Sequence, residues 1–365
     1  MKTLILMVMS LVAPVLAQPT SGKPGSYTLL GSLGQSYLIR MELERSGDVF
    51  RGSYRYERPG VVRPGSNSIG LTGSIDSGGN LQLIETAEVS GRPGSPGRLG
   101  VVRTGEFNGR LITTTANGQS LLHLAGTWTR SRDGRRMPFS LDQLRLNFGN
   151  DQLTSREEKE EQKPLNYGVR LNLPVLGGPE SKFNRHLAAI VNPLAADFRK
   201  DVADLRKDEQ GLRSEMPASS LDVDYAIVSA TPELISLQLT IYSYTGGAHP
   251  NGQTRSFNWD PRSESEIQLA DLFTPGSAYG RIIADYCRRE LARLDIGDRE
   301  WLARGTAFDE ENYQRWNPTR AGLRITFDPY QVAAYAQGAF EVTVPWGTLK
   351  TLLRPSFGQI DQAGK

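Results

Sequence analysis

The sequence predicts a multi-domain protein in which an all-β unit, a small antiparallel barrel or sandwich, precedes an α+β module with an antiparallel sheet and packed helices. Three observations lead to this prediction. The chain has 365 residues, more than one domain usually needs. Its 38 glycines and 21 prolines are typical of a chain with many turns. Alternating apolar and polar segments fill the first 150 residues, whereas long helical periods begin only after residue 180.

The first 17 residues, MKTLILMVMSLVAPVLA, have the pattern of a secretory signal peptide. One lysine precedes a short apolar core, and Val15-Leu16-Ala17 offers a small-residue cleavage site. The apolar run is shorter than the roughly 20 residues that span a bilayer, and no later segment approaches that length. We therefore expect cleavage after Ala17, a secreted or periplasmic location and no membrane anchor.

Residues 25–150 are predicted to form the β unit. In the segment LIRMELER, Ile39, Met41 and Leu43 alternate with charged residues, a period of two that buries one face of a strand. Similar segments follow at a spacing of roughly 8–12 residues, which is typical of a barrel or sandwich. A Gly-x-aromatic pattern recurs at Gly52, Gly105 and Gly126. We interpret it as aromatic rings that close the core against glycine.

The segment DQLTSREEKEEQKP, residues 151–164, interrupts the alternation. It is densely charged, shows no apolar period and ends in proline, so it is predicted to be a linker between the two units. The charge changes sign on either side of it. Residues 18–150 carry 16 Lys and Arg against 10 Asp and Glu, a net +6, and residues 151–365 carry 25 against 30, a net −5. An acidic C-terminal half favours a basic partner.

Residues 165–357 are predicted to form the α+β module, with a companion segment over 165–220 and the main part over 221–357. Apolar residues recur at steps of three and four from Phe183 to Leu205, which predicts a long helix. Pro193 lies inside this helix and is expected to kink or restart it. Three strands follow, and a second helix is predicted from Tyr279 to Leu294.

The stretch YSYTGGAHPNG places His249 in a loop between two predicted strands. Gly246, Gly247 and Pro250 flank it, and binding residues often lie on loops that rigid strands support. The histidine can be a contact residue for a ligand, or its ring can bond a backbone carbonyl and fix the loop. The sequence leaves these two alternatives open. A third is catalysis by a cell-envelope hydrolase that uses His249 and a nearby carboxylate, which requires a substrate proton within reach.

Metal, nucleotide and nucleic-acid sites have no support in the sequence. The three histidines and the single cysteine are scattered, without the spacing of a zinc site. His123 is expected on the solvated face of a strand, His186 beside the apolar face of the long helix, and Cys287 on a buried helical face. Phosphate-binding glycine loops are missing, and the arginines do not line up with aromatic residues. We expect no cofactor, no metal and no nucleic-acid partner.

Two motifs in the C-terminal part form a specific combination. The first is Gly-Gly-Ala-His at 246–249, and the second is Asp-Pro-Tyr-x-Val-Ala-x-Tyr-Ala-x-Gly at 328–338, with IQLADLF between them. On these motifs, residues from about Leu165 to Phe357 resemble the extracellular region of the RsiV family of lysozyme-sensing anti-sigma factors. They also resemble the accessory domain of some peptidoglycan deacetylases. The β unit is not covered by this resemblance.

The resemblance implies a mixed α/β recognition module outside the cytoplasm, whose ligand is a protein or is derived from peptidoglycan. The sequence shows neither a cytoplasmic segment that could hold a sigma factor nor a deacetylase domain, so neither activity is expected. We predict a secreted or periplasmic binding protein without catalysis of its own, which recognises a cell-envelope component or a protein such as lysozyme. The predicted binding residues are Gly246, Gly247, His249, Asn251, Tyr330 and Tyr335. The oligomeric state is left open.

Overall fold

The structure of the chain is a computed structural model. It describes residues 25–34, 37–57, 68–89, 100–116, 119–208, 218–247, 249–294, 296, 298–319 and 321–357. The expected signal peptide and Ala248 lie outside the described residues. The chain divides into two compact units between Gln143 and Leu144. Among the described residues, no helix combines the length and the apolar character needed to cross a membrane.

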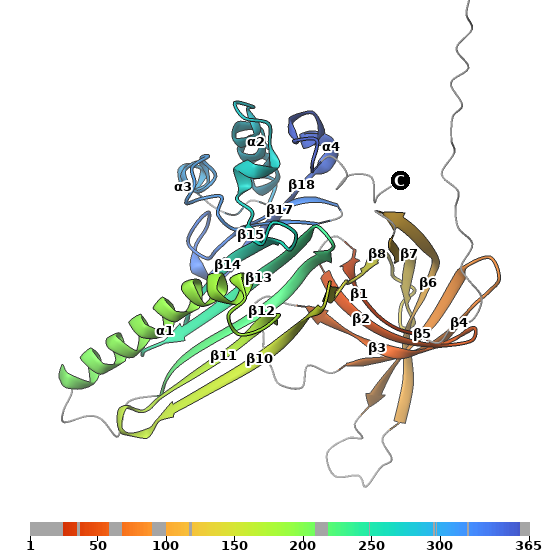
Figure 1. The fold of residues 1–365 in the computed structure, drawn as a ribbon, viewed down its shortest axis with the longest axis horizontal. Helices are drawn as coiled ribbons and strands as arrows, with labels where there is room; N and C mark the ends of the chain where they lie inside the picture. Colours follow the sequence, from red (N-terminus) through yellow and green to blue (C-terminus); the bar gives the residue numbers. More distant parts are fainter. Residues whose placement is uncertain are drawn as a thin grey trace, which may run out of the picture. The chain divides into compact units, whose positions relative to one another are not determined.

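The first unit is a closed antiparallel barrel of eight strands in sequential order (Figure 1). Closure comes from the pairing of the first and last strands, with Leu29 opposite Gln143 and Leu33 opposite Phe139. The strands are β1 (Gly25–Leu33), β2 (Tyr37–Ser46), β3 (Val49–Glu57), β4 (Ile69–Ile75), β5 (Asn80–Val89), β6 (Gly100–Ala116), β7 (Gln119–Arg130) and β8 (Arg136–Gln143). The predicted small antiparallel barrel is therefore confirmed.

Aromatic rings fill the barrel as the Gly-x-aromatic pattern indicated. Tyr54, Phe107 and Trp128 are buried, and the rings of Tyr54 and Phe107 meet edge to face at 5.3 Å. A Cβ atom at Gly126 would lie 2.1 Å from a backbone oxygen of the neighbouring strand, so only glycine fits there. Glu85 is also buried in the barrel, which its sequence context did not indicate, and its carboxylate accepts hydrogen bonds from Tyr54, Thr104 and Trp128 at 2.6–2.8 Å. These three donors meet the hydrogen-bonding needs of the buried carboxylate.

The second unit is built on a seven-stranded sheet in the order β15-β14-β13-β12-β11-β10-β9. Its pairs are antiparallel except for β11 and β12, which run parallel and are joined by the crossover helix α1. The elements are β9 (Asn147–Phe148), β10 (Asp151–Gln162), the 3-10 turn η1 (Lys163–Leu165), β11 (Tyr167–Leu176), α1 (Lys182–Asp208), β12 (Ser219–Thr231), β13 (Leu234–Tyr244), β14 (Asn251–Asp260) and β15 (Ser265–Glu266).

The charged segment predicted as a linker is part of this sheet, and that prediction was wrong. Its residues form β10 and η1, and β10 pairs with β11 from Leu153 opposite Leu176 to Gln162 opposite Tyr167. Only Leu153 is buried, because β10 lies near the edge of the sheet and most of its side chains on both faces meet water. No apolar period can therefore appear in the sequence. Charged side chains are a common protection of such edges.

Helix α1 covers one face of the sheet (Figure 1). Phe183 packs edge to face against Phe257 and Trp259, at 5.3 and 5.7 Å between ring centroids. The helix runs through Pro193 without restarting, and buried residues on both sides of the proline keep it on the sheet. Near its end, Leu205 is exposed and Arg206 is buried, with Arg206 Nε donating to Leu165 O at 3.1 Å.

A third layer lies against the other face of the sheet. It consists of a three-stranded antiparallel sheet and short helices around a common apolar core. The elements are η2 (Leu269–Leu272), α2 (Tyr279–Ala292), α3 (Arg299–Gly305), β16 (Trp316–Pro318), β17 (Gly322–Phe327), η3 (Tyr335–Gln337), β18 (Phe340–Pro345), α4 (Trp346–Leu349) and η4 (Lys350–Leu352). Cys287 is fully buried in this core, as predicted, and burial raises the pKa of its thiol to about 12.

The two faces of the large sheet have different chemistry. One side of β13 is apolar and faces α1, because Leu237 is paired with Phe257, which contacts Phe183 of α1. The apolar residues on this side are Ile235, Leu237, Leu239 and Ile241. The residues between them, Ser236, Gln238 and Thr240, lie on the opposite side and are also buried. This opposite side is called the polar face below. It carries the candidate site.

Candidate functional site

The loop that carries His249 (the first loop) and the segment 328–338 (the second loop) meet at one end of the polar face. Tyr335 Oη donates to Pro250 O at 2.6 Å, although the two residues are 85 positions apart. The ring of His249 stacks on that of Tyr335, with centroids 3.8 Å apart and planes 14° from parallel. Tyr330 completes the group, with its ring 5.3 Å from that of Tyr335. We call the residues Gly246, Gly247, His249, Asn251, Tyr330 and Tyr335 the two-loop surface.

The two-loop surface faces solvent. Gly246, Gly247, His249 and Asn251 are exposed, and Tyr330 keeps 55% of its surface accessible. The two glycines have φ angles of +120° and +100°, which favour glycine, and a side chain at either position would meet no atom within 4 Å. The loop therefore turns sharply at a place with free space around it, so that a partner could approach the backbone closely.

The surroundings of His249 bear on the alternatives that the sequence left open. Its Nδ1 donates to Pro250 O at 3.0 Å, so the ring helps to fix its own loop. The same ring is exposed and stacked on Tyr335, so it also forms part of a surface. Among the described residues, no carboxylate is hydrogen-bonded to it. The ring therefore fixes its own loop and is at the same time exposed at a surface.

Tyr330 has an unusual backbone conformation. Its φ angle is +70°, a left-handed value that is rare for a bulky residue. Such strain costs on the order of 1–3 kcal/mol and is typical of functional sites whose surroundings enforce it. One enforcing contact is Trp301 Nε1, which donates to Tyr330 O at 2.9 Å. The ring of Tyr330 is thereby directed to solvent by a strained backbone.

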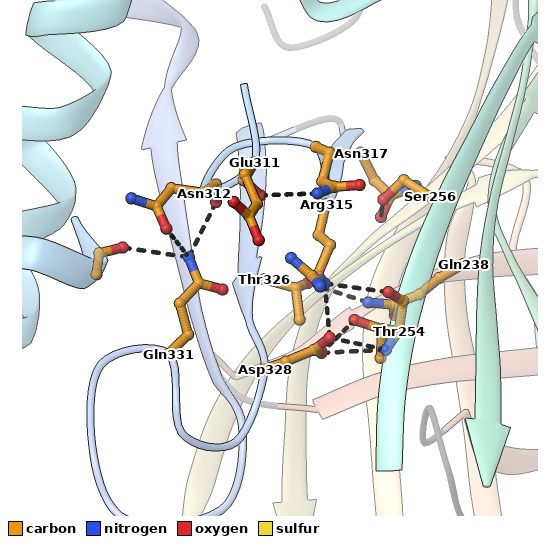
Figure 2. A network of polar contacts seen from close by, with 12 residues as sticks. Gln238, Thr254, Ser256, Glu311, Asn312, Arg315, Asn317, Thr326, Asp328 and Gln331 are labelled. Carbon is orange, nitrogen blue, oxygen red and sulfur yellow. Dashed lines mark hydrogen bonds and ion pairs between the residues drawn. The ribbon is translucent and has the colours of Figure 1, made fainter. Parts of the chain in front are cut away.

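Asp328 fixes the second loop to the sheet (Figure 2). Its buried carboxylate accepts from Thr254 N at 3.0 and 3.1 Å and from Thr254 Oγ1 at 2.6 Å. Arg315 Nε completes the arrangement at 2.6 Å from Asp328 Oδ2 and also contacts Thr254 O. Thr254 lies three residues after Asn251, so this carboxylate places the start of the second loop beside the end of the first. The motif contained Asp328, but its role was not predicted.

A buried polar network supports the same region. Gln238 Nε2 donates to Thr326 Oγ1 at 3.0 Å, and Asn317 Nδ2 donates to Ser236 Oγ at 2.9 Å, so that β13 is joined to β16 and β17. On the other side of the second loop, Gln331 Nε2 donates to Gly305 O and Asn312 O (Figure 2). These bonds use polar atoms that burial would otherwise leave unsatisfied. They give the two-loop surface a rigid base.

The other histidines lie away from this surface. His123 was expected on a solvated strand face, but only 6% of it is exposed, and its Nδ1 donates to Asp142 Oδ1 at 2.8 Å on the barrel. His186 Nδ1 donates to Lys182 O on α1, and its ring lies 5.2 Å from that of Trp259. In the described parts of the chain, no group of three His, Cys, Asp or Glu side chains is arranged to hold a metal ion.

Two family models match the second unit. Residues 158–252 match the model described as Deacetylase PdaC, and residues 270–347 match a protein of unknown function (DUF3298). The second unit resembles the RsiV and PdaC proteins. The two-loop surface forms where these matched regions meet, with His249 in the first and Tyr335 in the second.

Curated relatives agree with this resemblance. The peptidoglycan-N-acetylmuramic acid deacetylase PdaC of Bacillus subtilis (strain 168) is 29% identical over 203 residues, 55% of this chain and 41% of that protein. Anti-sigma-V factor RsiV of the same organism is 26% identical over 141 residues, 37% of this chain and 48% of that protein. Esterase Rv3036c of Mycobacterium tuberculosis is 28% identical over 117 residues, which are 32% of this chain and 51% of that protein. The chain thus spans about half or less of each relative.

Proposed function

We propose that this protein acts outside the cytoplasm as a non-catalytic binding protein, which recognises a cell-envelope component or a protein such as lysozyme through the two-loop surface. The observation that carries the proposal is the exposed stack of His249 on Tyr335 beside Tyr330. The name of PdaC gives peptidoglycan as its substrate, which supports a role connected with the cell envelope. The name of RsiV gives a sigma factor as its target.

The physical chemistry of the surface supports binding. Tyrosine is enriched among the residues that contribute most to protein interfaces, because its ring offers apolar area and its hydroxyl a hydrogen bond. The hydrogen bond from Tyr335 to Pro250 and the contacts of Asp328 hold both loops before a ligand arrives. A surface that is already ordered loses less conformational entropy on binding. The net charge of −5 on residues 151–365 favours a basic partner through faster association.

The experiment compares two ligands and two variants of the mature chain. Binding to lysozyme and to purified peptidoglycan is measured for the wild type, for Tyr330→Ala and for His186→Ala. The control residue His186 is exposed on α1 and outside the two-loop surface. We expect Tyr330→Ala to weaken binding roughly 30-fold, the effect of losing about 2 kcal/mol. His186→Ala should bind as the wild type does. Equal affinities for all three proteins would refute the role of the surface.

A second candidate function is that of a cell-envelope hydrolase using His249 and a nearby carboxylate. The observation that favours it is the esterase among the relatives. Against it stands the contact of the His249 ring with a backbone carbonyl instead of an acid. Ester hydrolysis by the wild type that His249→Ala abolishes would establish this alternative, and hydrolysis that persists in the variant would exclude His249 as its base.

Localisation forms part of the proposal. We expect the mature chain to begin at Gln18, after removal of the signal peptide. Mass spectrometry of the protein recovered from its native location tests this directly. A chain that retains Met1 or Lys2 would contradict an extracytoplasmic role.

A further inference from the structure

The polar face continues beyond the third layer as a row of side chains across four strands. Strand register places Tyr242 opposite Asp222, Asp222 opposite Arg170, and Arg170 opposite Lys159. The neighbouring positions on the same face are Asp224, Asn172 and Glu157, with Asn172 opposite Glu157. We call these seven residues the polar row.

Arg170 lies at the centre of the polar row. Its Nε is 2.9 Å from Asp222 Oδ1, and its Nη1 is 3.4 Å from Asp224 Oδ2 and 3.7 Å from Glu157 Oε1. Asn172 Nδ2 donates to Asp224 Oδ1 at 2.9 Å. Two of the three carboxylates are still accessible, since the side chains of Asp222 and Glu157 keep 41% and 45% of their surface, whereas Asp224 keeps 14%. The row is therefore fixed in position and open to solvent.

The polar row adjoins the two-loop surface. Tyr242 is the link, because its ring packs beside Gly252, and a Cβ atom on that glycine would lie 2.9 Å from it. Gly252 follows Asn251 of the two-loop surface directly. Burial first, and then the electrostatic effect of Tyr335, raises the pKa of Tyr242. Aromatic rings thus border one end of the polar row.

The charges of the polar row indicate which class of ligand can bind there. Three carboxylates against one arginine and one lysine disfavour a polyanion such as a nucleic acid. Acidic side chains and lysine are also depleted from the centres of protein interfaces, and here they occupy the centre. A sugar chain fits both features. Its hydroxyls pair with carboxylate, guanidinium and amide groups, and the C–H faces of its rings cover aromatic rings.

We propose that the polar row, bordered by Tyr242 and Tyr335, binds a glycan strand whose sugars are uncharged or carry free amino groups. This proposal rests on the proposed binding function and names a ligand class for it. The ion pairs within the row hold the acceptors and donors in place for the hydroxyls. If the row only stabilises a solvated sheet face, its charges affect folding and no sugar binds.

The test uses the mature full chain and two defined probes, N-acetylated chitohexaose and its deacetylated counterpart, in isothermal titration calorimetry. Asp222→Asn keeps the shape of the side chain and removes its charge. Glu158→Gln is the matched control, because Glu158 points to the other face of β10, is half exposed and pairs with Arg156. Glu157→Gln is a second test variant on the polar face, in case Asp222→Asn reduces folding.

We expect the wild type to bind at least one probe. Asp222→Asn should bind that probe about tenfold more weakly, because a hydrogen bond to a charged group is lost. Glu158→Gln should bind it with the affinity of the wild type. Preference between the probes shows whether acetylated or free amino groups are recognised. Failure of the wild type to bind either probe, while lysozyme still binds, would overturn the glycan proposal and leave the proposed function standing. Equal losses in Asp222→Asn and Glu158→Gln would also overturn it.

Discussion

The side chain of Tyr335 makes two contacts that mutation can separate. Its ring stacks on His249, and its Oη donates a hydrogen bond to Pro250 O. Tyr335→Phe removes the hydrogen bond and keeps the ring. We expect it to lower the free energy of unfolding by about 1 kcal/mol, the net value of one hydrogen bond, and to leave ligand binding nearly intact. Tyr335→Ala should lose both. Urea unfolding together with the binding assay checks this, and equal binding losses in the two variants would disprove the role of the ring.

Asp328 is the residue on which the position of the second loop depends most. Its carboxylate is paired with Arg315 and bonded to Thr254, and little of it meets water. We expect Asp328→Ala to lower the free energy of unfolding by about 3 kcal/mol, because Arg315, whose side chain is only 20% exposed, loses its carboxylate partner. Glu157→Gln on the open part of the face should change it by less than about 0.5 kcal/mol. Similar unfolding midpoints in urea for both variants would contradict this assignment.

Among the elements, β10 shows most clearly what the sequence could not reveal. A strand with solvent on both faces has no apolar period, so its charges resembled those of a linker. The backbone of the segment is hydrogen-bonded to β11, and segments paired in this way open to proteases less readily than exposed loops. We therefore expect limited proteolysis under native conditions to leave residues 151–164 intact, although they contain two sites for trypsin, after Arg156 and after Lys159. Mass spectrometry of the fragments checks this, and early cleavage within the segment would restore the linker interpretation.

The contact between β10 and α1 gives this part of the fold a defined dependence on pH. Hydrogen bonds from Arg199 first and Tyr167 second lower the pKa of Glu160 below its usual 4.5. A depressed pKa in the folded state means that the carboxylate stabilises the fold above about pH 4.5, the unfolded value, and that this contribution is lost as the pH falls through the folded pKa. Glu160→Gln should therefore flatten the fall in stability between about pH 6 and pH 3. An unchanged pH profile in urea unfolding would exclude this contribution.

Strand β13 explains why the layers were harder to predict than the strands. Its bounds, Leu234–Tyr244, agree with the alternation in the sequence. Alternation usually indicates one solvated face, yet Ser236, Gln238 and Thr240 are buried beneath the third layer. Asn317 is hydrogen-bonded to Ser236 and Thr326 to Gln238, from strands some 80 positions later. Only the pairing of distant segments shows that a polar face can be an interior one.

At the scale of the whole molecule, the sequence predicted an antiparallel barrel followed by an α+β module, and the structure confirms both. It also identified the two loops that form the surface, because each loop carries a recognisable motif. It could not predict that His249 stacks on Tyr335, since that contact depends on the clamp between Asp328 and Thr254 and on the docking of β16 and β17. Spacing along a chain does not determine contacts across 85 positions.

The central claim is that the two-loop surface is where this protein meets its ligand. Hydrogen–deuterium exchange of the mature chain, with and without saturating lysozyme or solubilised peptidoglycan, tests it most directly. The account predicts slower exchange on ligand addition in residues 244–252 and 328–338, with unchanged exchange in the barrel strands β1 to β8. Protection confined to the barrel or to α1, or no protection with either ligand, would contradict it.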